Sequence, residues 1–398
     1  MKTMIKAVWL IATLVALGAC KKHKHTEVVT PPEQNKMVFF SDVTGSTYAV
    51  NALTGTGMWK YDFNGGSSYN TAAAVTKNAV VYTDYETGTV MCYNINTGSL
   101  IWSKTVQVSW SASPLIINDV VYVAVSGGII GYALNDGAEV KSISIPGNLT
   151  PNSLNYYQNR FIIGTCGGHL VGINTDGVVL WEYLSGYGCY HNNPVIVNDV
   201  LYIISSGGKL SAVDPVNGLE RWSRNIGEYS QNVTPVYNNG LLFVQGYADQ
   251  NHYYAIDITN GDVSRRFTLP DGQTNGYGYN TPAVMADVMY AVTAEGRLLA
   301  YNINTQQLVW QNQLGTAGAR SVPTGVMLDG RLQDMDAISS IVIANNVLYF
   351  AYGKSMFATS LNGEKKWEMF AGNYILSSPV IMSSYEKVYR PANAGVVQ

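Results

Sequence analysis

The amino-acid sequence predicts an all-β protein, an eight-bladed β-propeller built from four-stranded antiparallel blades. Three observations lead to this prediction. One sequence unit recurs eight times after residue 37, at intervals of about 40 residues, the length of a propeller blade. Each unit contains four short runs of β-branched and aromatic residues, separated by turns rich in Asn, Asp and Gly. Beyond the first twenty residues, no segment has the period of a helix.

The composition excludes several classes of protein. Of the 398 residues, 47% are hydrophobic and 13% are charged, so the chain is too apolar to be a disordered low-complexity polymer. The 24 basic and 27 acidic residues form no basic stripe, which argues against a nucleic-acid partner. Only one long apolar run is present, at the N-terminus, so a protein with several membrane-spanning helices is excluded.

The first residues have the pattern of an export signal. Lys2 and Lys6 come before an apolar run and two small residues, an order typical of a secretory signal, here residues 1–19. The segment Leu17-Gly18-Ala19-Cys20 resembles the lipobox of bacterial lipoproteins. The resemblance implies that the chain is cut before Cys20 and that the Cys20 thiol is acylated. The alternative is an ordinary signal peptide with an incidental cysteine.

Residues 20–36 are predicted to form a flexible tether. Lys21-Lys22-His23-Lys24-His25 would follow the lipid, and Pro31-Pro32 lies near the end of this polar stretch. Its positive charge suits anionic head groups, and a plain solvated linker explains it equally well. We expect the propeller to fill residues 37–398.

The unit from Asn193 to Ile226 illustrates the four strands of a blade. Its apolar runs are separated by Asn198-Asp199, by Ser206-Gly207-Gly208 and by Asn217-Gly218. These residues mark hairpins, because Gly and Asn accept the positive φ angles that tight turns need.

The two ends of the repeat region are predicted to complete one blade together. Met37–Phe40 has the pattern of a second strand, and Ser378–Met382 that of a first strand without a blade of its own. Pairing of these N- and C-terminal strands would close the ring and cover an exposed sheet edge. Residues 387–398 have no assigned place in this scheme.

Most units carry a tryptophan after the turn between the third and fourth strands. The pattern Ala-x-Asp-x-x-Thr-Gly-x-x-x-Trp runs from Ala49 to Trp59, with Asn51 for Asp, and from Ala212 to Trp222, with Asn217 for Thr. Two units lack the tryptophan, with Val140 and Arg265 at the equivalent positions, and Gln306 stands where Gly is expected. The tryptophans of the other units are Trp59, Trp102, Trp181, Trp222, Trp310 and Trp367.

This pattern resembles the tryptophan-docking motif of PQQ-like propellers, and the resemblance extends over roughly residues 37–385. It implies that each tryptophan packs across to the neighbouring blade. There a large ring buries much area, and its N–H can reach a backbone carbonyl. The six tryptophans are therefore expected to be structural.

Two branches of this superfamily imply different functions. Quinoprotein dehydrogenases hold their cofactor with an adjacent Cys-Cys pair, a calcium site and a catalytic Asp. The cysteines here are Cys20, Cys92, Cys166 and Cys189, and no calcium-ligand set or catalytic carboxylate can be placed by motif. The propeller lipoproteins of the Bam outer-membrane assembly complex are similar to this chain in lipobox, tether and blade number, and they have no enzyme activity.

The second resemblance implies a non-catalytic scaffold or binding module of the bacterial envelope, with a function in outer-membrane protein assembly. We expect a lipid anchor in the outer membrane, on its periplasmic or its surface side, a protein partner, and neither a cofactor nor a metal. The alternatives are a surface lipoprotein that binds carbohydrate or peptide and, less favoured, a small PQQ-dependent dehydrogenase.

Aromatic residues in the links before the first strands are candidates for binding. First strands line the central channel of a propeller, so these side chains are expected to ring its mouth. Tyr and Trp combine a large contact area with a polar tip, which suits peptide or sugar partners. The alternative is that they plug the channel or pack between blades. The candidates are Tyr69, Trp110, Tyr190, Tyr229, Tyr279 and Tyr374.

Cys166 with His169, and Cys189 with His191, lie in a turn and a link that are expected on the same face. A Cys166–Cys189 disulfide, a zinc site and unpaired thiols are the alternatives. Cys92 lies in an apolar run and is expected to be a core residue. The longest interval between units contains residues 315–336, which are predicted to form a long polar loop.

Overall fold

Every regular element in the described part of the chain is a β-strand. No helix in that part is long and apolar enough to cross a membrane. Residues 322–328 and 331–335 are described by their backbone alone. The computed structural model describes residues 32–62, 71–109, 112–145, 151–165, 167–185, 192–205, 208–226, 234–246, 251–275, 281–315, 322–328 and 331–392.

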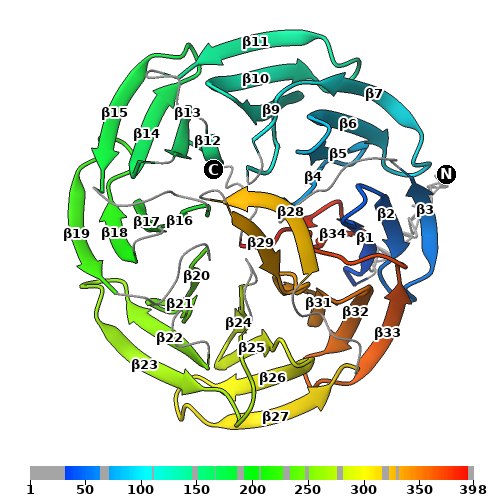
Figure 1. Ribbon diagram of the computed structural model, residues 1–398, viewed down its shortest axis with the longest axis vertical. Coiled ribbons are helices and arrows are strands. Elements are labelled where there is room, and N and C mark those ends of the chain that lie inside the picture. Colours follow the sequence, from blue (N-terminus) through cyan, green and yellow to red (C-terminus); the bar gives the residue numbers. More distant parts are fainter. Residues whose placement is uncertain are drawn as a thin grey trace, which may run out of the picture. The chain divides into compact units, whose positions relative to one another are not determined.

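The strands of the unit Glu33–Gln398 form a ring of eight antiparallel sheets, so the predicted eight-bladed β-propeller is confirmed (Figure 1). Seven sheets have four strands and one has a fifth. Within a blade, each strand pairs with the next, from the first strand beside the axis to the fourth at the rim.

The blades are numbered along the chain, and the strands of each are given from the first to the fourth. Blade 1 contains β34 (Val380–Ser383), β1 (Asn35–Ser41), β2 (Thr47–Asn51) and β3 (Gly57–Tyr61). Blade 2 contains β4 (Ala74–Val75), β5 (Ala79–Asp84), β6 (Thr89–Asn94) and β7 (Leu100–Thr105). Blade 3 contains β8 (Leu115–Ile117), β9 (Val120–Val125), β10 (Gly128–Ala133) and β11 (Glu139–Ser144). Blade 4 contains β12 (Pro151–Tyr157), β13 (Arg160–Thr165), β14 (His169–Asn174) and β15 (Val179–Leu184).

The second half of the ring repeats the arrangement. Blade 5 contains β16 (Val195–Val197), β17 (Val200–Ile204), β18 (Lys209–Val213) and β19 (Glu220–Asn225). Blade 6 contains β20 (Val236–Asn238), β21 (Leu241–Gln245), β22 (His252–Asp257) and β23 (Val263–Thr268). Blade 7 contains β24 (Ala283–Met285), β25 (Val288–Val292), β26 (Arg297–Asn302) and β27 (Leu308–Gln313). Blade 8 contains β30 (Val342–Ala344), β31 (Val347–Tyr352), β32 (Ser355–Ser360) and β33 (Lys365–Phe370).

Because strand direction alternates, the ring has two different faces. Face 1 carries the turns between first and second strands and those between third and fourth strands. Face 2 carries the turns between second and third strands and the links between blades. The tight turns of Face 1 use paired positive φ angles, as at Asn198 (50°) and Asp199 (56°), which explains why Asn-Asp and Asn-Asn recur there.

Both ends of the chain build blade 1, so the predicted closure is confirmed. β34 pairs antiparallel with β1, which places Val380 opposite Phe39 and Ile381 opposite Val38. Residues without an assigned place in the sequence scheme extend the same sheet, because β35 (Val388–Tyr389) pairs with β34 as a fifth strand.

The long polar loop predicted between blades 7 and 8 is instead largely a hairpin. β28 (Val322–Leu328) pairs antiparallel with β29 (Arg331–Met335), and Figure 1 shows the pair drawn over the middle of the ring. The sequence contains the signal for it, since Asp329-Gly330 separates two runs with apolar residues. The prediction of a loop had relied on the charged residues of this segment, such as Arg320, Asp329 and Asp334.

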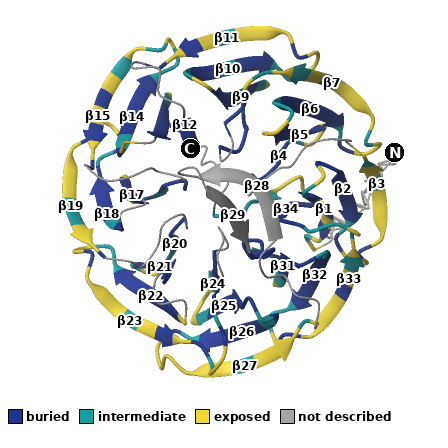
Figure 2. Ribbon diagram, viewed as in Figure 1, coloured by how far each residue is buried: buried dark blue, intermediate teal, exposed yellow. Residues whose placement is uncertain are grey.

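The apolar core lies between adjacent blades. Phe243 and Tyr253 of blade 6, for example, belong to one buried cluster with Met289 and Leu299 of blade 7. Each inner strand is covered on both sides by neighbouring blades, so runs such as Leu348–Ala351 are apolar without alternation and wholly buried. The rim strands are largely exposed, as Figure 2 shows.

Tryptophans of the fourth strands join most blades to the next. The Trp222 indole N–H donates to the Ile258 carbonyl of blade 6 at 3.1 Å, and the Trp367 N–H donates to the Ala52 carbonyl of blade 1 at 2.9 Å. Trp59, Trp102 and Trp181 donate in the same way to the carbonyls of Ile95, Leu134 and Pro215.

Each of these rings lies over a glycine in the next blade. A Cβ atom added to Gly261 would lie 2.5 Å from the Trp222 ring, and the φ angle of Gly261 is +77°. Close approach and positive φ therefore both require glycine. Trp310 lies over Gly363 in the same way.

Strand register identifies the residues that replace tryptophan in blades 3 and 6. Ala212 pairs with Trp222, and by the same register Ala255 pairs with Arg265, as the sequence spacing predicted. In blade 3, Gly131 pairs with Lys141, so the equivalent residue is Lys141 and the sequence assignment of Val140 was wrong. Lys141 stands four residues after Gly137, as Trp222 does after Gly218, so the turn has the regular length.

Trp222→Ala is expected to lower the free energy of unfolding by about 3 kcal/mol, because it removes a large ring from a half-buried junction. Trp222→Phe keeps most of the ring and loses only the N–H bond, so it should cost about 1 kcal/mol. Urea unfolding followed by circular dichroism measures both. An alanine variant as stable as the parent would contradict the docking role.

Candidate functional site

The predicted aromatic mouth falls mostly on residues that the structure leaves undescribed. Tyr69, Trp110, Tyr190, Tyr229 and Tyr279 lie outside the described residues. Tyr374 is half-buried against a core cluster of blades 7 and 8, and the Lys354 ammonium lies 4.9 Å from its ring centroid. The binding role of the mouth stays a prediction.

The predictions for three of the four cysteines are also untested. Cys20, Cys166 and Cys189 lie outside the described residues, as does His191. The His169 Nδ1 atom contacts the Glu182 carboxylate on the neighbouring strand. In the described ranges, no group of three or more His, Cys, Asp and Glu side chains could hold a metal ion.

Cys92 is fully buried in the cluster between blades 2 and 3. Burial raises the pKa of its thiol to about 12. A thiol in such surroundings is inert, because the thiolate is the reactive form.

A belt of small polar side chains surrounds the axis at the start of the first strands. These hydroxyls accept backbone N–H groups of the preceding blade. The Ala72 N–H donates to Ser113 Oγ at 2.9 Å, and the Thr281 N–H donates to Ser340 Oγ at 3.1 Å. The Asn193 and Ser340 N–H groups donate likewise to Thr234 Oγ1 and Ser378 Oγ.

The polar belt supplies hydrogen-bond acceptors for backbone N–H groups that would otherwise be unpaired. Entering first strands have backbone donors that no strand ladder satisfies, and a buried unpaired N–H is costly. Sequence reasoning missed the belt, although a signal was present. A hydroxyl or amide residue stands directly before a proline in Ser113-Pro114, Asn193-Pro194, Thr234-Pro235, Thr281-Pro282 and Ser378-Pro379.

The two junctions without tryptophan are built differently from each other. Between blades 3 and 4, Lys141 Nζ lies 3.2 Å from Asp176 Oδ1, so an ion pair bridges the junction. Between blades 6 and 7, the Arg265 guanidinium has no hydrogen bond or ion pair with a described residue. Gln306 replaces the glycine of blade 7, and its Oε1 atom accepts the Arg266 N–H at 3.2 Å.

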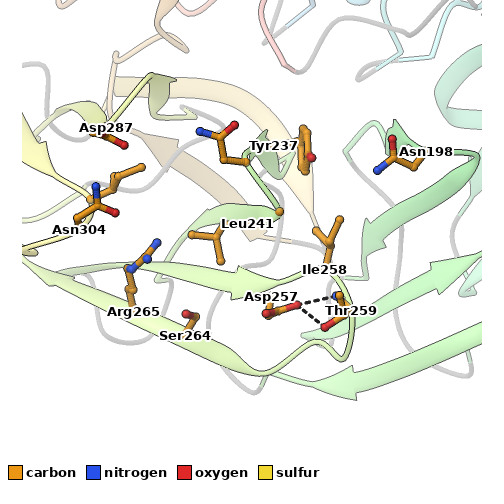
Figure 3. A pocket seen from close by; sticks show the side chains of 13 residues that line it. Asn198, Tyr237, Leu241, Asp257, Ile258, Thr259, Ser264, Arg265, Asp287 and Asn304 are labelled. Atoms are coloured by element: carbon orange, nitrogen blue, oxygen red, sulfur yellow. Dashed lines mark hydrogen bonds between the residues drawn. The ribbon is translucent and has the colours of Figure 1, made fainter.

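A cavity of about 510 Å³ opens on Face 1 at this second junction. We call it the junction pocket. Leu241, Ile258 and Ile303 supply its apolar lining, and Arg265 extends from β23 toward Asn304 and Leu241 (Figure 3). The polar groups around it include Asn198, Tyr237, Asp257, Asp287, Arg265 and Asn304.

Asp257 is held in place by its own turn. Its Oδ1 atom accepts the Thr259 hydroxyl at 2.5 Å and the Thr259 N–H at 2.8 Å (Figure 3). These hydrogen bonds lower the pKa of the Asp257 carboxyl, so it is ionised at neutral pH. The described residues that line the junction pocket include no Cys, His or Lys, and they offer charges and hydrogen-bonding groups suited to binding.

Comparison with known proteins identifies the family. The sequence matches the family described as outer membrane protein assembly factor BamB at residues 43–233 and again at residues 187–382. The chain belongs to the BamB family. These matches together extend through the blades from Val43 onward, so the expected resemblance is confirmed.

Relatives named BamB are distant in sequence. BamB of Moranella endobia is 26% identical over 318 residues, which covers 72% of this chain and 78% of that protein. The crystal structure of BamB from Moraxella catarrhalis superposes with a TM-score of 0.61 at 16% identity and covers 80% and 88% of the two chains, a likeness of fold.

The fold also occurs in enzymes. The tetrathionate hydrolase of Acidithiobacillus ferrooxidans is 23% identical over 261 residues, covering 61% of this chain and 48% of that protein. The relationship to BamB proteins therefore identifies the family. Because the same fold is found in enzymes and in proteins without enzymatic activity, catalysis depends on the residues of the site and not on the fold.

Ser113→Ala is expected to lower the free energy of unfolding by about 1–3 kcal/mol, because it leaves the buried Ala72 N–H without an acceptor. Ser113→Thr keeps the hydroxyl, which Thr234 supplies at the equivalent position, and should be close to neutral. Urea denaturation compares the two variants. Equal stability of the alanine and threonine variants would show that this bond contributes nothing.

Proposed function

We propose that this protein is a non-catalytic binding scaffold of the bacterial envelope that takes part in outer-membrane protein assembly. The observation that carries the proposal is the family match, which extends from residue 43 to residue 382. Some relatives named as outer membrane protein assembly factors align along most of their own length, 78% for that of Moranella endobia and 81% for that of Shewanella oneidensis.

The arrangement of side chains supports a binding role. The recurring tryptophans and hydroxyls are used in joining blades, and the polar groups of the junction pocket are suited to holding a ligand. A propeller of this kind presents two broad faces on a rigid ring, which suits attachment of other polypeptides. We therefore infer protein partners in the envelope and no enzymatic activity.

A membrane anchor completes the proposal. We infer that residues 1–19 are an export signal, that Cys20 is the acylated first residue of the mature chain, and that the polar stretch between Cys20 and β1 tethers the propeller to the outer membrane. The support is the lipobox-like sequence and the polar stretch that follows it.

The partner is tested by affinity purification of the tagged full-length chain from detergent-solubilised membranes, with an unrelated tagged lipoprotein as control. We expect a protein of the outer-membrane assembly machinery to be recovered with this chain alone. Recovery of a glycan or a free peptide without any such protein would favour the ligand-binding alternative. A quinone absorbance spectrum in the purified protein would support the dehydrogenase alternative.

Cys20→Ser is expected to move the protein from the membrane fraction to the soluble fraction, because the acyl chains supply the affinity for the bilayer. Cys92→Ser is the matched control, since Cys92 is buried in the ring, and it should remain with membranes. Fractionation with a high-salt wash measures both. A Cys20→Ser protein that stays in the washed pellet would contradict the lipid anchor.

A further inference from the structure

The regular junctions show what the docking position of this propeller accepts. At the junction of blades 1 and 2, the Trp59 indole N–H donates to the Ile95 carbonyl at 2.9 Å, beside Gly98. Ile95 itself donates its N–H to the Asn78 carbonyl. An aromatic ring with an N–H group is thus the natural occupant of this position.

The same acceptor is present at the junction of blades 6 and 7. Ile303 occupies the position of Ile95, because its N–H donates to the carbonyl of Asp287, as that of Ile95 does to Asn78. No donor from the described residues reaches the Ile303 carbonyl. Ile303 and Asn304 both line the junction pocket.

Two substitutions distinguish this position from the regular junctions. Arg265 stands where the tryptophan would be, and its half-buried guanidinium is without a partner among the described residues. Gln306 stands where glycine lies beneath the ring, and its side-chain oxygen is bonded to the Arg266 N–H. At the junction of blades 3 and 4 the replacement differs, since Lys141 is paired with Asp176.

We propose that the junction pocket binds an aromatic side chain, preferably an indole, presented by a partner polypeptide on Face 1. The indole N–H would donate to the Ile303 carbonyl, as the tryptophans at the other junctions donate to theirs. The ring would be displaced from residue 306 toward the pocket, because Gln306 leaves no room for the close approach that glycine allows elsewhere. The Arg265 guanidinium would lie against the ring face, since planar cations stack on aromatic rings.

The rim of the pocket fits the backbone that would carry this ring. Asn198, Asn304 and Asp287 are exposed around the opening, and amide and carboxylate side chains accept or donate to peptide groups. The proposal rests on the proposed function in one respect only, that the partner is a polypeptide.

The test uses the purified full-length chain and the probe N-acetyl-tryptophan amide, with N-acetyl-leucine amide as the apolar control, followed by saturation-transfer NMR and titration. We expect the tryptophan probe to bind and the leucine probe to bind at least tenfold more weakly. Equal binding of the two probes, preferential binding of a sugar such as maltose in the same assay, or no binding of the tryptophan probe would overturn the proposal.

A double variant, Arg265→Trp with Gln306→Gly, restores the docking pattern and should fill the pocket from within the chain. We expect it to lose tryptophan-probe binding by at least tenfold while its Tm stays the same or rises. Lys141→Trp makes the matched change at the junction of blades 3 and 4 and should bind the probe as the parent does. Undiminished binding by the double variant would overturn the proposal.

Arg265→Ala keeps the pocket open and removes only the cation, so it remains informative if the double variant does not fold. We expect it to weaken probe binding several-fold with an unchanged Tm, and unchanged binding would refute the stacking role. Probe binding is measured on the purified protein without any partner. Its outcome is therefore independent of the affinity purification that tests the proposed function.

Discussion

The contact on which this structure depends is the tryptophan that reaches from one blade to the next. A blade is a thin sheet with two apolar surfaces, and neither surface has a core until another blade covers it. The ring of Trp222 lies on Gly261 and ties its N–H to the carbonyl of Ile258, so burial and hydrogen bonding act at one place. Repeated around the ring, the contact sets the angle between neighbours and closes blade 8 against blade 1 through Trp367.

A second set of contacts completes the joint at the opposite face. Tryptophans act on Face 1 toward the rim, where fourth strands begin, and the hydroxyls of the polar belt act on Face 2 beside the axis, where first strands begin. Junctions that have both contacts, such as that of blades 2 and 3, are therefore held at two separated points. The residues that recur from unit to unit largely join the blades, so a specific function is better sought where a unit departs from the pattern.

The departures are few and chemically distinct. At one junction Lys141 and Asp176 replace packing by an ion pair, which keeps the junction bridged. At another, Arg265 and Gln306 line or border a pocket in which the Ile303 carbonyl and the Arg265 guanidinium have no partner among the described residues. The hairpin β28–β29 is a third departure, inserted between blades 7 and 8. These features make some parts of an otherwise repetitive ring different from the rest. A scaffold needs such differences, because each partner must recognise one particular surface.

The sequence by itself determined the fold class, the number of blades and the closure of blade 1, because turn residues and apolar runs recur locally with every unit. It also indicated the irregular units, since Arg265 and Gln306 break a visible pattern. Only the tertiary structure showed that these two residues, about 40 positions apart, meet at one junction. The pocket and the polar belt depend on contacts between blades, and such contacts join residues that are far apart in the sequence, where no local pattern relates them.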